Sequence, residues 1–241
     1  MPGKADRRGD PPDSGLRAGA REGGRQAINR VLRLFPLPEV VLLPGTLLPL
    51  HIFEPRYRAM VADSLEGDRL IGMAMLEPGW EAGGDSPRIC AVGGAGEIVE
   101  SEKLPDGRYN ILLEGRFRYR VLNEQAASTP YRIAAVEEIA SVPFPTAEDE
   151  DRARAAAVRL FESLRTALDL SPMPPESLPA ERFASEMALR LRHAPAELQA
   201  LLETDSLAAR FDSMIARMAE WEERVRFLAP YRLKDLDVRK N

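Results

Sequence analysis

The hydrophobic pattern of this chain changes its period near residue 141, and this change limits the folds that the chain can adopt. From Val31 to about Ala140, short apolar runs are separated by turn residues, whereas the following chain repeats apolar residues at helical spacing. A period of two is typical of half-buried strands, and a period of 3.6 is typical of amphipathic helices. The sequence therefore predicts an α+β protein, with a β-rich domain over residues 31–140 and a helical bundle over residues 141–230.

The clearest strand signal is the segment RFRYRV at 116–121. Strand geometry puts its apolar side chains on one face and its arginines on the other: Phe117, Tyr119 and Val121 against Arg116, Arg118 and Arg120. Further strands are predicted at 34–38, 47–53, 70–76, 89–99, 109–113 and 131–139. Glycines at 93, 94 and 96 indicate a bulge or a barrel corner in one of them.

One helix interrupts these strands. Pro55 suits a first helical position, and Gly67 suits the C-terminal end. The apolar face between them would carry the side chains of Tyr57, Met60, Val61 and Ser64. Several short strands with one inserted helix favour a small, partly open barrel over a parallel βαβ sheet.

The second half predicts four helices, the first capped by Thr146 and the last running over 206–228. In this last helix, seven apolar residues recur at alternating spacings of four and three: Leu207, Phe211, Met214, Met218, Trp221, Val225 and Leu228. Such a heptad seam packs against other helices. We expect it to pack on the chain's own helices, and the alternative is a homodimer or a partner bound through 206–228.

The two ends of the chain differ from the rest. Residues 1–30 contain seven Lys and Arg against four Asp and Glu, a net charge of +3, and they contain no aromatic residue. Such a segment cannot bury enough apolar surface to offset the entropy lost on ordering. We expect a disordered basic tail over 1–30 and a C-terminal tail over 231–241.

The sequence contains no recognisable motif of a common enzyme or metal site. There is no Walker-type loop, no G-x-S-x-G and no H-E-x-x-H. The single cysteine, Cys90, follows an isoleucine in an apolar strand and is expected to be inert, and His193 is expected at a helix C-terminus, where a partly charged imidazole is favourable. We therefore expect no catalytic residue, no metal and no cofactor. No membrane span or secretory signal is evident, so we expect a cytoplasmic protein.

Several motifs together resemble a known family. They are LFPL at 34–37, VLLPG at 41–45, LPLHIFEPRY at 48–57, GRFR at 115–118 and LQALLETD at 198–205. In this order they resemble the N-terminal domain of Lon proteases, and the form LHIFEPRY is similar to bacterial stand-alone versions that lack the protease. The resemblance covers about 33–228.

The resemblance implies a PUA-like β pseudo-barrel followed by an α-helical bundle. It also implies a non-catalytic module that recognises polypeptides and is linked to proteolysis or quality control. The chain ends at Asn241, so we expect neither the ATPase nor the Ser-Lys protease domain. The expected partners are an unfolded or specific client protein, with a protease or a chaperone as a further partner. The family signature residues are expected to be mainly structural: Pro44, Gly45, Pro49, His51, Glu54, Pro55, Arg56 and Tyr57.

Three aromatic residues are the candidate peptide contacts: Phe53, Trp80 and Phe117. Trp80 lies in a segment, 77–88, that holds three glycines and two prolines, which is typical of a surface loop. The alternative function is RNA binding through the arginine face of 116–121. The charge opposes it, because residues 31–140 carry 11 basic and 16 acidic groups and the whole chain has a net charge of −5.

Overall fold

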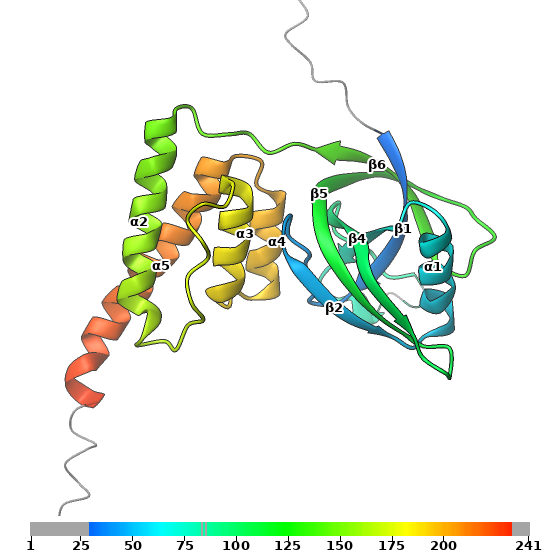
Figure 1. Cartoon of the computed structure of the whole chain (residues 1–241), viewed down its shortest axis with the longest axis horizontal. Helices are drawn as coiled ribbons and strands as arrows, with labels where there is room; N and C mark the ends of the chain where they lie inside the picture. Colours follow the sequence, from blue (N-terminus) through cyan, green and yellow to red (C-terminus); the bar gives the residue numbers. More distant parts are fainter. Residues whose placement is uncertain (1–28, 83, 85, 233–241) are drawn as a thin grey trace, which may run out of the picture.

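The computed structural model describes residues 29–232, except 83 and 85. It consists of a β-barrel and a group of helices beside it (Figure 1). The first strand begins at Asn29 and the last helix ends at Arg232, so both elements extend two residues into the segments predicted to be tails. The rest of the predicted tails, 1–28 and 233–241, lies outside the described residues.

Six strands form the barrel: β1 (Asn29–Leu37), β2 (Leu47–Ile52), β3 (Leu70–Met75), β4 (Val92–Lys103), β5 (Tyr109–Gln125) and β6 (Arg132–Ile139). Their order is β2-β5-β4-β3-β1-β6, and an additional pairing of β5 with β6 closes the sheet. β1 and β3 are parallel, and the other pairs are antiparallel. The predicted α+β class is confirmed. The sequence favoured a partly open barrel, and the pairing of β5 with β6 closes it.

β5 is one continuous strand, whereas the sequence predicted two strands separated at Glu114-Gly115. Gly115 stays in the strand because its N–H donates to the Thr46 carbonyl at 2.9 Å and its carbonyl accepts from Gly45 at 2.8 Å. Before this point β5 pairs with β2, and after it β5 pairs with β6. β2 is therefore an edge strand, which explains how it tolerates Pro49.

The glycines of β4 have the predicted role. The pairing of β4 with β5 shifts its register between Ala95 and Gly96, which is the expected bulge. A Cβ atom on Gly94 would overlap with the carbonyl of Leu42, so this position requires glycine for close backbone approach.

Helix α1 (Pro55–Glu66) buries the predicted residues Tyr57, Met60, Val61 and Ser64. The first three pack in one cluster with strand residues such as Phe35, Ile71 and Leu113, so the inserted helix closes one side of the barrel interior. A short 3-10 helix, η1 (Trp80–Ala82), lies between β3 and β4.

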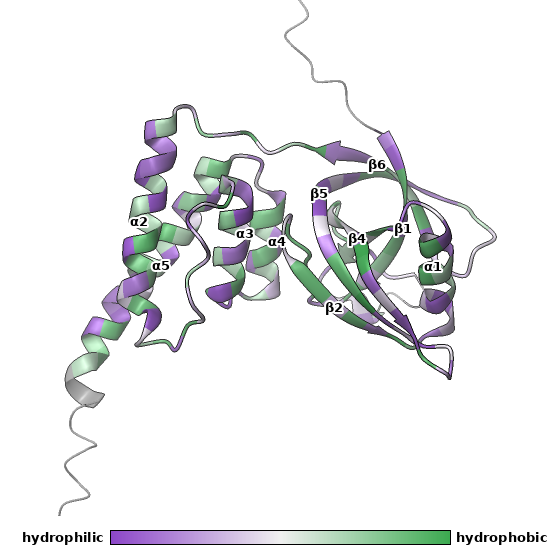
Figure 2. Cartoon of the chain, in the orientation of Figure 1, coloured by the Kyte–Doolittle hydropathy of each residue, from purple (hydrophilic) through white to green (hydrophobic). Residues whose placement is uncertain are grey.

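The helical part contains α2 (Ala147–Arg165), α3 (Ala180–Arg190), α4 (Pro195–Glu203) and α5 (Leu207–Arg232). Thr146 caps α2 as predicted, because its Oγ1 accepts the Asp149 N–H at 3.1 Å. α2 carries both hydrophilic and hydrophobic residues along its length, and α5 extends beyond its end (Figures 1 and 2). Five seam residues of α5, from Phe211 to Val225, pack into the chain's own helical core. Leu207 is buried, whereas Leu228 is 47% exposed.

The barrel and the helices share one core. Leu43 and Val92 of the barrel belong to the same apolar cluster as Phe161, Phe183 and Phe211 of the helices. The Gln199 side chain also donates to the Val92 carbonyl at 2.9 Å. The helical part therefore packs directly against the barrel.

Arg118 corrects the prediction of an exposed arginine face. Its side chain is fully buried between the barrel and the helices, although Arg116 and Arg120 on the same strand are exposed. Nη1 donates to the Leu202 carbonyl at 2.8 Å and to Asp205 Oδ1 at 3.0 Å. Nη2 donates to the Ala140 carbonyl at 3.2 Å. Arg118 thus bonds β5 to the α4–α5 connection and to the chain entering the helical part.

The environment of His193 also differs from the expectation of a partly charged imidazole at a helix C-terminus. Its side chain is only 5% exposed, and Nδ1 lies 3.4 Å from Glu197 Oε2. Burial and the neighbouring Arg217 guanidinium lower the pKa of His193 below its ordinary value of 6.5, and the Glu197 carboxylate opposes this only in part. The folded protein therefore holds a neutral imidazole here rather than a partly charged one.

We predict that Arg118→Leu lowers the free energy of unfolding by about 2–4 kcal/mol, because it leaves buried carbonyl groups without donors. Arg120→Leu is the matched control two residues along the same strand, and it should change stability by less than about 0.5 kcal/mol. Urea denaturation of both variants measures the difference. Equal effects would mean that the buried network contributes no net stability.

We predict that stability falls as the pH drops below 6.5, the ordinary pKa of the His193 side chain. Below this pH the unfolded chain binds a proton that the folded state, with its lowered pKa, does not bind, so stability rises with pH in this window. Thermal unfolding at pH 7.5 and 5.5 measures the loss. The variant His193→Gln should lose less than the wild type, and an identical loss would contradict the prediction.

Candidate functional site

A cleft opens at one end of the barrel, where β1 and β3 both end. Because these two strands are parallel, their carboxyl ends meet at the same edge of the sheet. Pro36, Leu37 and Pro38 therefore lie close to Leu76 and the loop that follows β3. The beginning of α1 and Arg132 at the beginning of β6 complete the cleft, which has a volume of about 600 Å³.

The loop over 77–88 is closed at its base by backbone contacts. Leu76 donates to the Leu37 carbonyl at 3.1 Å, and Glu77 donates to the Arg88 carbonyl at 3.0 Å. The guanidinium of Arg132 donates to the Pro87 carbonyl at 2.9 Å and forms an ion pair with Glu124. These contacts hold Trp80, which is 37% exposed, on the wall of the cleft.

The lining combines apolar and charged groups. Three prolines, two leucines and Trp80 supply apolar surface, whereas Glu54, Arg56, Glu81 and Arg132 supply charges of both signs. Recognition sites commonly combine an apolar wall with a few placed polar groups that fix orientation. The cleft is therefore suited to a ligand that exposes apolar side chains and also has hydrogen-bonding groups, as a polypeptide does.

Tyr57 links the cleft to the barrel core. Its ring packs on Phe35 with centroids 4.3 Å apart, and the Arg56 guanidinium lies over its outer side at 4.5 Å. Burial raises the pKa of Tyr57, so the hydroxyl stays protonated. This hydroxyl makes no hydrogen bond with any residue that the structure describes, so it can still bond to a ligand.

The Glu54 side chain precedes α1 but makes no capping hydrogen bond to it. Its carboxylate instead forms an ion pair with Arg56 at 2.9 Å. The first turn of α1 relies on the Glu54 carbonyl, which accepts from Arg58, and on Pro55, which has no N–H to satisfy.

The three aromatic candidates do not come together. Trp80 lines the cleft, but Phe53 and Phe117 do not. Phe53 is 61% exposed and stacks on His51, with the ring centroids 6.4 Å apart. Phe117 is half-buried, packs against the barrel core and is covered by Arg30 at 5.0 Å, so little of its ring is free to meet a ligand.

The other signature residues do not line the cleft and lie in the loop before β2 and on β2 itself. Pro44 is buried, and Gly45 adopts a φ of +77°, which favours glycine. His51 lies on β2, where Nδ1 is 2.7 Å from Asn110 Oδ1 and Nε2 is 3.2 Å from an Arg108 nitrogen. His51 is thus held by neighbouring side chains of the barrel surface.

Sequence reasoning missed Arg132 and the prolines of the β1 end as cleft residues. The apolar segment containing Pro36 and Pro38 was predicted as a strand, but the sequence gives no sign that β1 pairs with β3 in parallel. Without that pairing, nothing connects these prolines to the loop that carries Trp80.

The described residues contain no group of three or more His, Cys, Asp or Glu side chains placed to hold a metal ion. Cys90 is half-buried, and burial raises the pKa of its thiol, so the thiolate is disfavoured. Within the part of the chain that the structure covers, no helix has both the length and the hydropathy that crossing a membrane requires.

Comparison with known proteins identifies the family. The model of the ATP-dependent protease La (LON) substrate-binding domain matches residues 31–220. The chain belongs to the Lon substrate-binding domain family. The match includes the barrel, the cleft and most of the helical part.

Similar proteins agree with this assignment. The chain is 34% identical over 153 residues to a Lon protease of Dictyoglomus thermophilum, covering 64% of this chain and 19% of that protein. It is 26% identical over 194 residues to Lon protease 2 of Myxococcus xanthus, covering 77% of this chain and 23% of that protein. The chain therefore spans about a quarter or less of the length of these curated relatives.

Two solved structures share the fold. The Lon N-terminal domain protein from Xanthomonas campestris superposes with a TM-score of 0.57 at 23% identity, covering 78% of this chain and 98% of that chain. The N-terminal domain of Mycobacterium avium complex Lon protease gives a TM-score of 0.61 at 16% identity, with 79% and 98% covered. Isolated Lon N-terminal domains are thus matched almost over their whole length.

We predict that the signature residues separate into a structural and a surface group. Tyr57→Ala removes a buried ring and should lower the free energy of unfolding by about 3–5 kcal/mol. Glu54→Gln breaks an exposed ion pair and should cost less than about 1 kcal/mol. Chemical denaturation measures both values, and a large loss for Glu54→Gln would show that this carboxylate has a structural role that the ion pair does not explain.

Proposed function

We propose that this protein recognises polypeptides without catalysing their cleavage, and that it binds apolar client segments in the cleft beside Trp80. The observation that carries the proposal is the composition of the cleft: an apolar wall with Trp80, rimmed by Arg56, Arg132 and Glu54. Membership of a substrate-binding domain family supports the same function.

The geometry favours a peptide in an extended form. The apolar wall of the cleft can take alternate side chains, whereas the Tyr57 hydroxyl and the two guanidinium groups can bond to backbone carbonyls. Phe53 lies next to Glu54 in the chain and is exposed, so we propose that it extends the contact surface outside the cleft. Phe117 is better explained as part of the barrel wall.

The RNA-binding alternative depends on three arginines of β5, and two of them are buried or paired. Arg118 is buried, and Arg116 is paired with Glu97 at 2.9 Å and with Glu114 at 2.8 Å. Only Arg120 of the three is left on the surface without an ion pair to a described residue. A single free arginine on an acidic domain gives little basis for phosphate binding.

The proposal also covers which client the protein binds and what happens to that client after binding. A protein that holds apolar segments would deliver them to a protease or protect them as a chaperone partner, and we expect this to take place in the cytoplasm. Dimerisation through 206–228 has less support, because most of the seam packs on the chain's own helices.

We predict that Trp80→Ala weakens peptide binding about tenfold, because buried aromatic anchors carry a large share of binding energy. The probe is a fluorescein-labelled 12-residue peptide that alternates Phe and Leu with Ser and Gly, measured by fluorescence anisotropy. Phe53→Ala should give a smaller loss than Trp80→Ala.

Two controls make the result specific. Phe227→Ala changes an aromatic side chain of the helical part that is 70% exposed, and it should leave binding unchanged. A peptide with Ser in place of every Phe and Leu should not bind. If Trp80→Ala bound the apolar peptide as tightly as the wild type, the cleft would not be the recognition site.

A further inference from the structure

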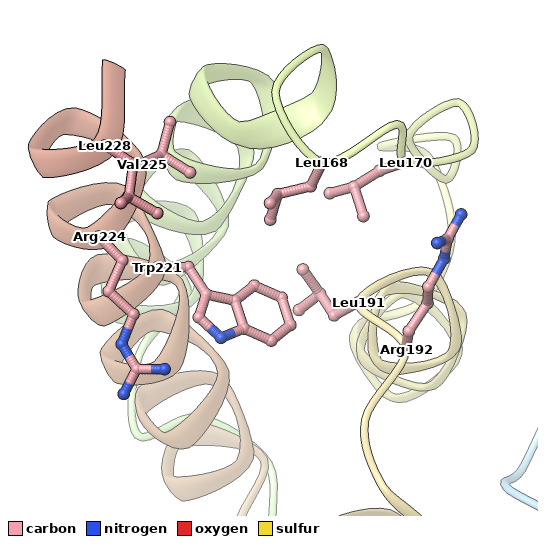
Figure 3. A pocket seen from close by; sticks show the side chains of 8 residues that line it. All are labelled: Leu168, Leu170, Leu191, Arg192, Trp221, Arg224, Val225 and Leu228. Carbon is pink, nitrogen blue, oxygen red and sulfur yellow. The ribbon is translucent and has the colours of Figure 1, made fainter. Parts of the chain in front are cut away.

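A second hollow lies in the helical part, away from the barrel (Figure 3). Its volume is about 350 Å³, which is within the range of about 300–1,000 Å³ that small-molecule sites occupy. Apolar side chains from three segments line it, and they belong to the end of α5, the end of α3 and the chain after α2: Trp221, Val225, Leu228, Leu191, Leu168 and Leu170.

The pocket arises where the heptad seam of α5 runs past the helices it packs on. Through Met218 the seam is buried, whereas Trp221 and Val225 are half-buried and Leu228 is largely exposed. The Arg217 guanidinium covers one side of the Trp221 ring at 4.7 Å. The indole therefore keeps a fixed position and points toward Leu191, as Figure 3 shows.

Only two charged side chains line the pocket, and both are cationic. Arg192 and Arg224 lie on opposite sides of it (Figure 3). Arg192 donates to the Asp169 carbonyl at 3.0 Å. Arg224 forms no ion pair or hydrogen bond with any described residue. A free cation beside an apolar cavity is complementary to a ligand whose negative charge lies next to a hydrocarbon body.

The elements that line the pocket favour a small ligand over a peptide. None of the eight lining residues lies in a strand: four belong to α5 and four to the turns that follow α2 and α3. The pocket therefore offers no strand edge for pairing with a peptide. The polar atoms of a peptide backbone would lie against leucine side chains and lose their partners. A ligand with polar atoms at one end only avoids this loss.

We propose that this pocket binds a small amphipathic carboxylate, an apolar chain or ring of the size of a medium-chain fatty acid, with its carboxylate at Arg224. The hydrocarbon body contacts Trp221, Leu191 and Leu168. This site is separate from the cleft beside Trp80 and does not depend on polypeptide recognition there.

The two tryptophans of the chain allow a direct test. In the full chain with Trp80→Phe, Trp221 is the only indole, so its emission reports on the pocket. Titration with decanoate, below the concentration at which it forms micelles, should give a saturable change with one site per chain. From hexanoate to decanoate the affinity should rise about fourfold for each CH₂ that becomes buried.

A comparison of variants and ligands isolates the contribution of the Arg224 charge to the binding affinity. Arg224→Gln should weaken decanoate binding about fivefold and leave decanol binding unchanged, because only the acid has a charge to pair. Arg226→Gln, two residues along the same helix and not part of the lining, should change neither. Decyltrimethylammonium, with the opposite charge, should bind more weakly than decanoate.

Three results would overturn the proposal. The first is the absence of a saturable response to decanoate. The second is an equal loss of decanoate and decanol affinity in Arg224→Gln. The third is displacement of bound decanoate, followed by Trp221 emission, by a lower concentration of a synthetic peptide of residues 233–241 or of the Phe/Leu peptide, which would assign the pocket to the chain's own end or to a client.

Discussion

The burial of one guanidinium between two parts of the molecule is the constraint on which the rest of the structure depends. Arg118 lies on β5, the strand that pairs with β2, β4 and β6, and it donates to the carbonyls of Leu202 and Ala140. A buried charge is costly unless it is paired and fully bonded. The helices must therefore stay in register with the barrel, because a small displacement would leave this charge without its acceptors.

A second arginine near Arg118 is buried and bonded in the same way. Arg210 is also buried, and it donates to the Thr204 carbonyl at 2.7 Å and pairs with Glu181 at 3.2 Å. Two arginines thus converge on the short connection between α4 and α5. The apolar cluster that joins Leu43 and Val92 to the helices supplies the packing energy, and the arginines fix the orientation. The barrel and the helices are therefore joined by a shared apolar cluster and by buried hydrogen bonds.

Local chemistry in the sequence was sufficient to predict most of the fold. Pro55, Gly67 and the spacing of Tyr57, Met60 and Val61 identify α1, and the glycines of β4 identify its bulge. These features depend on neighbours within a few residues. The continuity of β5 through Gly115 depends instead on Thr46, which is far away in the sequence. The burial of Arg118 depends on helices more than eighty residues later, so the alternating pattern alone could not distinguish it from Arg116.

The candidate site was less accessible to sequence reasoning for the same reason. Trp80 was recognised because it is an aromatic residue in a glycine-rich loop, but its partners Pro36, Pro38 and Arg132 come from two other segments. Their proximity follows from the parallel pairing of β1 with β3, which local patterns do not specify. The resemblance to a family could identify the signature around His51 and Tyr57, but it could not assign a function to each residue.

The cleft beside Trp80 and the pocket beside Trp221 differ in their lining chemistry, because different elements form them. The cleft is bounded by strand ends and loops, which bring together polar groups of both signs and leave the Tyr57 hydroxyl unbonded to described residues. The pocket is bounded by α5 and by the turns that follow α2 and α3, and its only charged lining residues are two arginines. A ligand with hydrogen-bonding groups along its length suits the first, and a ligand with charge at one end suits the second. The same α+β architecture therefore contains two cavities whose linings differ in chemistry.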